Sequence, residues 1–149
     1  MLSQQEAKGN GYTLIETLIV LVIVSIMSVV LVMNLNPIYN KKVIDTFLNQ
    51  LEKDLLYAQQ YALVNESTVY VVFSESEKKY RVANGIGDDL LSRNYHQHII
   101  FESATLENRV IYNRAGSIQK SGTMFIKYHS DKYRLVFYLG KGRFTIEKL

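Results

Sequence analysis

Glu16 is the residue whose type and position point most directly to a chemical role. It is the single charged residue within residues 12–33, a stretch dominated by Leu, Ile and Val. A carboxylate in surroundings of low dielectric constant is unfavourable unless a cation pairs with it, and such residues usually carry function. Alternatively, Glu16 lies near a helix start, where the positive end of the helix dipole stabilises it. Pairing with a cation and passive stabilisation are both open at this point.

Other residues with catalytic or metal-binding potential do not combine into a complete site. His96-x-His98 has the side chains of a metal site and would lie on one side of a strand, but no Cys or close carboxylate pair completes it. Ser, His and Asp occur without the sharp turn that frames a hydrolase nucleophile. Gly85-x-Gly87 lacks the third glycine of a dinucleotide loop, which favours a turn. We therefore expect no catalytic residue, metal or cofactor.

The segment that contains Glu16 has the length and hydropathy of a membrane-spanning helix. Twelve of the sixteen residues in 18–33 are Leu, Ile or Val. As a helix, residues 12–33 extend about 33 Å, close to the ~30 Å of a bilayer's hydrocarbon core. A cleaved secretory signal is disfavoured, because Asn34-Leu35-Asn36-Pro37 follows the run in place of an Ala-x-Ala-like site. An ordinary single-pass anchor remains compatible with the hydropathy.

The residues before the apolar run resemble the type IV prepilin signature. A short polar leader ends in Gly11, and the aromatic Tyr12 (where the family most often has Phe) precedes Thr13-Leu14-Ile15-Glu16 and the apolar run. The resemblance implies that a prepilin peptidase cleaves after Gly11 and that Tyr12 becomes the N-methylated mature N-terminus. It also implies that Glu16 neutralises the N-terminal amine of a neighbouring subunit during filament assembly. Glycine at the cut leaves the scissile backbone accessible.

The same resemblance implies where the chain resides and what it meets. It implies a single-pass protein of the cell membrane, with the C-terminal domain outside, that reaches the cell surface on assembly. The balance of Lys8 against Lys41 and Lys42 points weakly the other way. The implied partners are other pilin or pseudopilin subunits, the prepilin peptidase and the membrane, with the assembly ATPase and its membrane platform as indirect ones.

A second helical segment is predicted after the apolar run. Asn36-Pro37 predicts a break or kink, and Asn65-Glu66-Ser67 predicts the end. Between them one apolar stripe has helical spacing, which predicts an amphipathic helix. The stripe is short for a coiled coil, so a helix packed on a sheet is favoured. Its members are Ile44, Leu48, Leu51, Leu55, Ala58 and Ala62, widened by Phe47, Leu56 and Tyr61.

The remaining residues, 67–149, predict an antiparallel β domain. Alternation places Tyr133, Leu135, Phe137 and Leu139 on one face of a strand, and Phe144 and Ile146 on one face of the last. The short spacing of the last strands favours antiparallel pairing. With no Cys, the domain must be stable through its core alone. Strands are predicted at 68–73, 79–83, 98–101, 109–112, 123–129, 132–139 and 143–147.

These elements predict an α+β fold with the lollipop architecture of type IV pilins. The expected parts are a leader (1–11), a transmembrane and assembly helix (12–35), an amphipathic helix (36–66) and a β-rich domain (67–149). The turns and alternation of the last third also resemble minor pseudopilins. Chain size and the lack of Cys favour those of competence pili. This implies a non-catalytic filament subunit for DNA uptake, with a type II secretion pseudopilin as the alternative.

Direct contact with DNA is a further expectation left open by the sequence. Basic and aromatic residues interleave near the C-terminus, as in surfaces that bind single strands. The same pattern is typical of any exposed pair of strands, and a net charge of +3 is too small to argue for nucleic-acid binding. The residues are Lys127, Lys132, Arg134, Lys141 and Arg143, with Tyr128, Tyr133, Tyr138 and Phe144.

Overall fold

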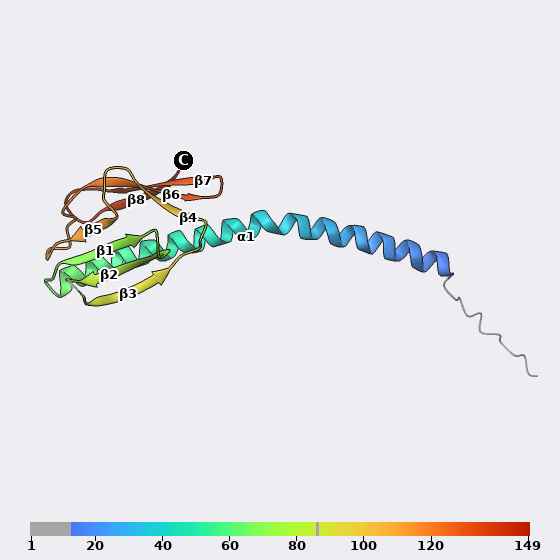
Figure 1. Ribbon diagram of the computed structural model, residues 1–149, viewed down its shortest axis with the longest axis horizontal. Helices are drawn as coiled ribbons and strands as arrows, with labels where there is room; N and C mark the ends of the chain where they lie inside the picture. Colours follow the sequence, from blue (N-terminus) through green and yellow to red (C-terminus); the bar gives the residue numbers. More distant parts are fainter. Residues whose placement is uncertain (1–12, 86) are drawn as a thin grey trace, which may run out of the picture. The chain divides into compact units, whose positions relative to one another are not determined.

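One helix and eight strands make up the described chain (Figure 1). The computed structural model describes the backbone of residues 13–85 and 87–149, and the side chains of all of these except 31–38. The chain divides into two units, residues 1–42 and 43–149, and the helix contributes to both. The elements are α1 (Leu14–Val64), β1 (Val69–Ser74), β2 (Lys79–Asn84), β3 (Asp89–Asn94), β4 (Ile99–Ser103), β5 (Arg109–Tyr112), β6 (Gly122–Tyr128), β7 (Asp131–Phe137) and β8 (Phe144–Lys148).

The sequence predicted a break or kink at Asn36-Pro37, and the break is contradicted, because the helix continues through these residues. The helical assignment of α1 continues from Leu14 to Val64. A proline removes one main-chain hydrogen bond, which weakens a helix without necessarily ending it. The segment that follows is held by the packing of its apolar stripe, so the helix continues beyond the proline. The predicted end is confirmed: the N–H of Ser67 donates to the carbonyl of Ala62, and Glu66 takes a left-handed φ of 48°.

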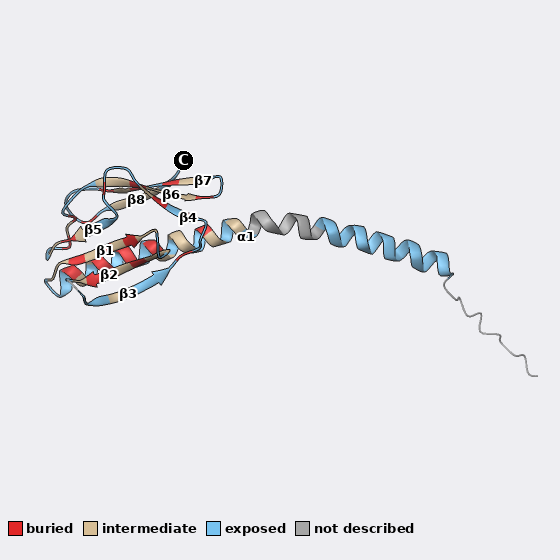
Figure 2. Cartoon of the chain, viewed as in Figure 1, coloured by how far each residue is buried: buried red, intermediate tan, exposed pale blue. Residues whose placement is uncertain are grey.

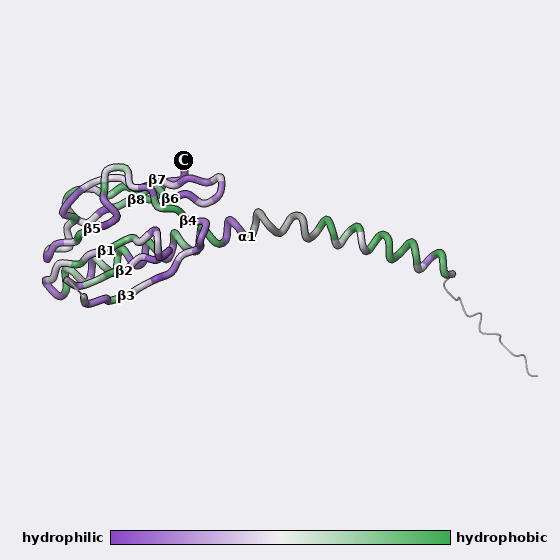
Figure 3. Tube along the Cα trace, viewed as in Figure 1, coloured by the Kyte–Doolittle hydropathy of each residue, from purple (hydrophilic) through white to green (hydrophobic). Residues whose placement is uncertain are grey.

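The N-terminal part of α1 presents an exposed apolar surface. Every side chain from Leu14 to Val30 is exposed (Figure 2), and the same stretch is strongly hydrophobic in Figure 3. Of the predicted span 12–33, residue 12 and the side chains of 31–33 lie outside those that the structure describes. Within the described residues, no helix is both long and apolar enough to pass through a membrane.

The second unit is built on the predicted stripe of α1. Ile44, Leu51, Leu55, Ala58 and Ala62 are fully buried, and Leu48 is partly so. A helix packed on sheets is therefore confirmed for this stretch. Leu56, predicted to widen the stripe, is instead 49% exposed, because it lies just outside the arc that faces the sheets.

Two four-stranded antiparallel sheets receive this helix, where the sequence predicted one sheet region. The first has the order β3-β2-β1-β5 and the second the order β4-β6-β7-β8. Ile118 links them, since it bridges Tyr112 at the end of β5 and Gly140 beyond β7. Seven strands match predicted ones to within two residues, whereas β3 was missed because it has no alternation of apolar and polar residues.

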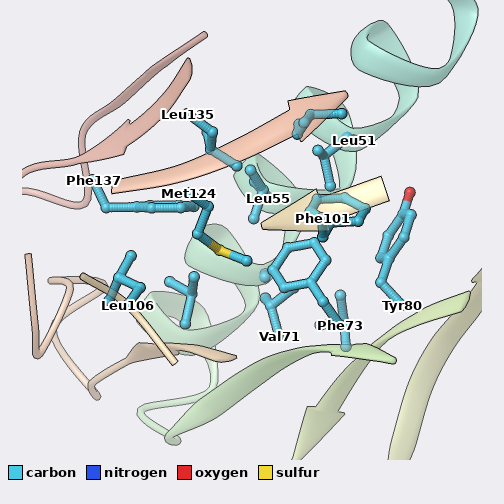
Figure 4. Packing of buried hydrophobic residues seen from close by; sticks show 14 of the residues in the cluster. Leu51, Leu55, Val71, Phe73, Tyr80, Phe101, Leu106, Met124, Leu135 and Phe137 are labelled. Carbon is cyan, nitrogen blue, oxygen red and sulfur yellow. The ribbon is translucent and has the colours of Figure 1, made fainter. Parts of the chain in front are cut away.

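The core lies between the helix and the inner faces of both sheets. Leu51 and Leu55 of α1 point toward Met124 and Leu135 of one sheet and Val71 of the other (Figure 4). The predicted inner face of β7 is confirmed for Tyr133, Leu135 and Phe137, which are buried. Leu139 was predicted to share that face but is 66% exposed, because β7 ends at Phe137 and the chain turns away.

Candidate assembly site

The cleavage junction predicted from the sequence precedes the described helix. Gly11 and Tyr12 lie outside the described residues. Thr13 caps α1: its carbonyl accepts from the N–H of Glu16 at 3.0 Å, and its Oγ1 lies 3.4 Å from the same nitrogen. Thr13-x-x-Glu16 has the residue types of a capping box, with Glu at the third helical position. The sequence analysis missed this role of Thr13, although the spacing was a recognisable signal.

Glu16 is placed by that cap in the first turn of α1. It is the acidic residue of the turn, and its side chain is exposed. The dipole of a helix favours a negative charge at this end. Among the described residues, the Glu16 carboxylate has no ion-pair partner in its own chain. The carboxylate is therefore available to a cation from elsewhere.

The hydroxyls within the apolar surface are satisfied inside the helix. Thr17 Oγ1 donates to the carbonyl of Leu14 at 2.8 Å, Ser25 Oγ to Leu21 at 2.7 Å and Ser28 Oγ to Val24 at 2.8 Å. Such bonds to the preceding turn leave no side-chain donor unpaired when water is removed. The surface around Glu16 is thus suited to apolar surroundings.

Asp54 is a buried carboxylate that the sequence analysis did not single out. It is 4% exposed and accepts hydrogen bonds from Tyr80 Oη at 2.6 Å, Arg93 Nε at 2.9 Å and Gln50 Nε2 at 2.9 Å. Burial, followed by the bond to Asp54, raises the pKa of Tyr80, and the bond to Asp54 raises that of Arg93. The signal was present: Asp54 falls in the stripe, three residues after Leu51 and four before Ala58. It joins α1 to β2 and β3.

The three histidines gather at one end of the second sheet. His96 and His98 lie in the turn before β4, and not on a strand as predicted. Their ring centroids are 5.1 Å apart, and the ring of His129, in the β6–β7 turn, is 4.8 Å from that of His98. Among the residues described, no group of His, Cys, Asp or Glu is arranged to hold a metal ion. Gly85 and Gly87 lie in the connection between β2 and β3, where a turn was expected, with φ of 75° and 96°.

The proposed basic and aromatic surface is divided by the fold. Lys127 and Arg134 lie on the outer face of the second sheet and pair with Glu102 and Glu147, and the bond to Glu147 raises the pKa of Arg134. Lys132 lies 4.0 Å from the centroid of the Phe125 ring. Tyr128 and Tyr133 are buried on the opposite face. Of the five basic residues predicted, Lys141 and Arg143 are those without a carboxylate or ring partner in the described structure.

Comparisons with known proteins agree with this arrangement of an exposed apolar helix and a helix-on-sheet domain. Residues 7–32 match the family model described as the prokaryotic N-terminal methylation motif. Over 139 residues the chain is 31% identical to the competence protein ComGD of Bacillus subtilis (strain 168). The aligned residues cover 93% of this chain and 94% of ComGD. The chain belongs to the ComGD family.

Solved structures of other pilins share the fold of this ComGD-family chain. The type IV minor pilin FimU of Pseudomonas aeruginosa (strain PAO1) superposes with a TM-score of 0.60 at 12% identity, over 72% of this chain and 89% of FimU. The minor pseudopilin EpsH from the type 2 secretion system of Vibrio cholerae gives 0.55 at 11% identity, over 71% and 97%. The predicted α+β pilin class, with a helix against antiparallel sheets, is thereby confirmed.

Proposed function

We propose that this chain is a minor pseudopilin of a competence pseudopilus, a structural subunit needed for DNA binding and uptake during transformation. The observation that carries the proposal is the likeness to ComGD along nearly the whole chain. A ComGD-family chain with the N-terminal methylation motif is a competence pseudopilin. Its relatives are filament subunits, and we propose that it likewise performs no catalysis and needs no cofactor.

Maturation is the first proposed step. A prepilin peptidase removes residues 1–11 by cutting after Gly11, and Tyr12 becomes the N-methylated N-terminus. The motif match over residues 7–32, which includes this junction, supports this step. The cut spares the helix, so the exposed apolar surface of α1 stays on the mature subunit.

Anchoring and assembly follow from that surface. We propose that residues 12–35 place the chain in the cell membrane as a single pass, with residues 36–66 continuing the helix and residues 67–149 outside, and that assembly brings it to the cell surface. The apolar side chains of Leu14–Val30 and their internally bonded hydroxyls support this placement. The assembly ATPase and its membrane platform would act on the filament rather than touch the outer domain.

Glu16 is proposed as the residue that docks the subunit. In the low dielectric of the membrane its carboxylate pairs with the N-terminal amine of a neighbouring pilin subunit, which fixes axial position as well as contributing energy. Its exposure and its freedom from partners in the described chain support this role.

A minor pseudopilin of a type II secretion system is the second candidate. The likeness to EpsH favours it, though at 11% identity that likeness shows the fold alone. Deletion of the gene, followed by separate transformation and protein secretion assays, decides between the two. We expect loss of transformation with normal secretion. Normal transformation would refute the competence role, and lost secretion would favour the alternative.

A further inference from the structure

The last strand, β8, has an open main-chain edge. It pairs with β7 alone and ends the second sheet. Beside the strand, the N–H of Tyr138 donates to the carbonyl of Arg143 at 2.9 Å, and that of Leu149 to Lys132 at 2.8 Å. Main-chain groups alternate sides along an antiparallel strand. Those of Phe144, Ile146 and Lys148 therefore point away from β7.

Two of the other sheet edges are covered by the chain itself. On β4, the N–H of Phe101 donates to Glu75 Oε2 at 3.2 Å, and the carbonyl of Ile99 accepts from Lys78 Nζ at 3.1 Å. On β5, the carbonyl of Ile111 accepts from the N–H of Gln119 at 3.0 Å. The edge of β3 is irregular, with a register shift between its partners Val82 and Ala83. Uncovered and regular edges are templates for pairing with another chain, and among the strands that the structure describes, β8 offers such an edge beside exposed apolar side chains.

That border is an open groove of about 880 Å³ beside the start of β8. Three exposed apolar residues line it: Leu56 of α1, and Tyr138 and Leu139, which follow β7; they are 49%, 46% and 66% exposed. The turn that closes the groove is fixed, because Gln59 Nε2 donates to the carbonyl of Lys141 at 2.8 Å. Its full lining is Glu52, Leu56, Gln59, Tyr138, Leu139, Gly140, Lys141, Gly142, Arg143, Phe144 and Thr145.

The charge of the groove favours an acidic occupant. Lys141 and Arg143 stand on the β7–β8 side, against the single acid Glu52 on the helix side. Within the described residues, none of the three forms a salt bridge. A partner that brings carboxylates to Lys141 and Arg143 would gain charge complementarity, which contributes mainly to specificity.

We propose that an extended, acidic segment of a different pseudopilin subunit binds here, pairing with the β8 edge as a fifth strand and placing apolar side chains in the groove. Strand addition supplies affinity through main-chain hydrogen bonds, and the flanking pocket selects the side chains. The fixed turn pre-organises the site and lowers the entropic cost of docking. The inference rests on the proposed function, since it takes its partner from the same filament.

Site-specific photo-crosslinking in transforming cells tests the proposal on the full-length chain. A benzophenone amino acid replaces Leu139 in the groove, and in the control it replaces Ile100, which is 43% exposed on the outer face of β4. We expect a light-dependent adduct from position 139 and not from position 100. Mass spectrometry should identify the crosslinked partner as a different subunit that carries the methylation motif. The proposal would be overturned by the absence of an adduct or by equal adducts at both positions. It would also be overturned by an adduct with DNA or with a second copy of this chain.

The edge itself is tested by Ile146→Pro against Ile146→Ala. Both remove the half-buried side chain, but the proline alone removes an N–H that faces away from β7, where sheets tolerate it. Loss of edge hydrogen bonds should reduce the adduct from position 139 about tenfold or more in Ile146→Pro relative to Ile146→Ala. Equal adduct yields in the two variants, at equal protein levels, would overturn strand addition.

Two charge-reversal variants test whether the occupant is acidic. Lys141→Glu should reduce the adduct, whereas Lys120→Glu, in the exposed β5–β6 connection, should leave it unchanged. Equal effects of the two variants would overturn the acidic occupant.

Failure of this proposal and failure of the proposed function are distinguishable. If gene deletion left transformation normal, the competence role would fall, while the adduct would still report whether the groove binds a subunit.

Discussion

Tyr80 Oη donates a 2.6 Å hydrogen bond to Oδ2 of Asp54, so the hydroxyl of a central strand holds a carboxylate of the helix inside the core. Both residues are buried, Tyr80 completely and Asp54 to 4% exposure. A second buried tyrosine offers the contrasting case. Tyr112 Oη, also fully enclosed, has no hydrogen-bond partner in the described structure. The two tyrosines thus separate the effect of a buried hydroxyl from that of its hydrogen bond.

Removing these two hydroxyls should have opposite consequences. Tyr80→Phe leaves a buried carboxylate short of one donor, so we expect the free energy of unfolding to fall by about 1–3 kcal/mol. Tyr112→Phe removes an unpaired buried polar group and should change stability by less than about 1 kcal/mol, in the stabilising direction. Urea unfolding of the full chain in mild detergent measures both. A larger loss for Tyr112→Phe than for Tyr80→Phe would contradict the hydrogen-bond assignment.

Stability should decline at alkaline pH. Burial raises the pKa of Tyr80, Tyr95 and Tyr112 above the ordinary value, with help from Asp54 for the first and Glu75 for the second. An unfolded tyrosine ionises near pH 10. Above that pH the unfolded chain binds fewer protons than the folded one, so stability is complete below it and falls as pH rises.

The expected slope is up to about 1.4 kcal/mol per pH unit for each of these tyrosines. Unfolding free energies between pH 8 and 11.5, with tyrosinate absorbance as the second signal, measure it. Tyr112→Phe should lessen the slope by one tyrosine's share. A flat profile across this range would count against the raised pKa values.

Glu16→Ala should leave membrane insertion intact and abolish incorporation into filaments. The substitution removes a carboxylate from an apolar surface, which insertion tolerates. If Glu16 pairs with a neighbour's amine as proposed, it also leaves that amine unpaired, at a loss of roughly thirtyfold or more in docking. Membrane fractionation, filament shearing and transformation counts measure the outcomes. Glu66→Ala, at the other end of α1, is the matched control. Normal filaments in Glu16→Ala would make Glu16 a passive residue.

Gly11→Val should block maturation. A β-branched side chain at the proposed scissile position obstructs close approach of the peptidase to the backbone. The unprocessed precursor, longer by eleven residues, then accumulates on a denaturing gel. Gly9→Val, two residues earlier in the leader, should be processed normally. Unchanged processing of Gly11→Val would place the cut elsewhere.

Gly142→Ala should destabilise the domain more than Gly85→Ala. Both glycines have positive φ, 68° and 75°, where a side chain is strained by about 1–2 kcal/mol. A Cβ on Gly142 would also lie 2.5 Å from the carbonyl oxygen of Gly116 and against the Gln59 amide, whereas one on Gly85 meets nothing within 4 Å. Thermal unfolding compares the two. Equal losses would mean that the turn can move away from α1.

Periodicity was sufficient to predict the elements whose burial alternates regularly. The stripe Ile44, Leu51, Leu55 and the alternation Tyr133, Leu135, Phe137 each mark a single buried face, so pattern and packing agree. β3 carries Asp89, Ser92 and Arg93 along a half-exposed edge. An edge strand buries little, so its sequence holds no period to recognise.

The polar and surface features were harder to predict because they depend on which segments meet. Asp54 is acceptable in an apolar stripe only because Tyr80 and Arg93 come from strands 26 and 39 residues away. The groove beside β8 was not predicted, because the sequence pattern placed Leu139 within the strand, whereas β7 ends two residues earlier. The position of Glu16 in the first turn of α1 depends on local sequence alone and was simple to predict, whereas its role in assembly stays a prediction.

The internal bonding of Thr17, Ser25 and Ser28 has a consequence for movement within the proposed filament. A neighbouring apolar helix that slides along α1 breaks no hydrogen bond with these hydroxyls. The free energy of the pair therefore varies little with axial displacement, except where Glu16 meets a cation. In the proposed filament, a subunit would therefore shift along its neighbour against a low barrier, and the pairing proposed for Glu16 would set its axial position.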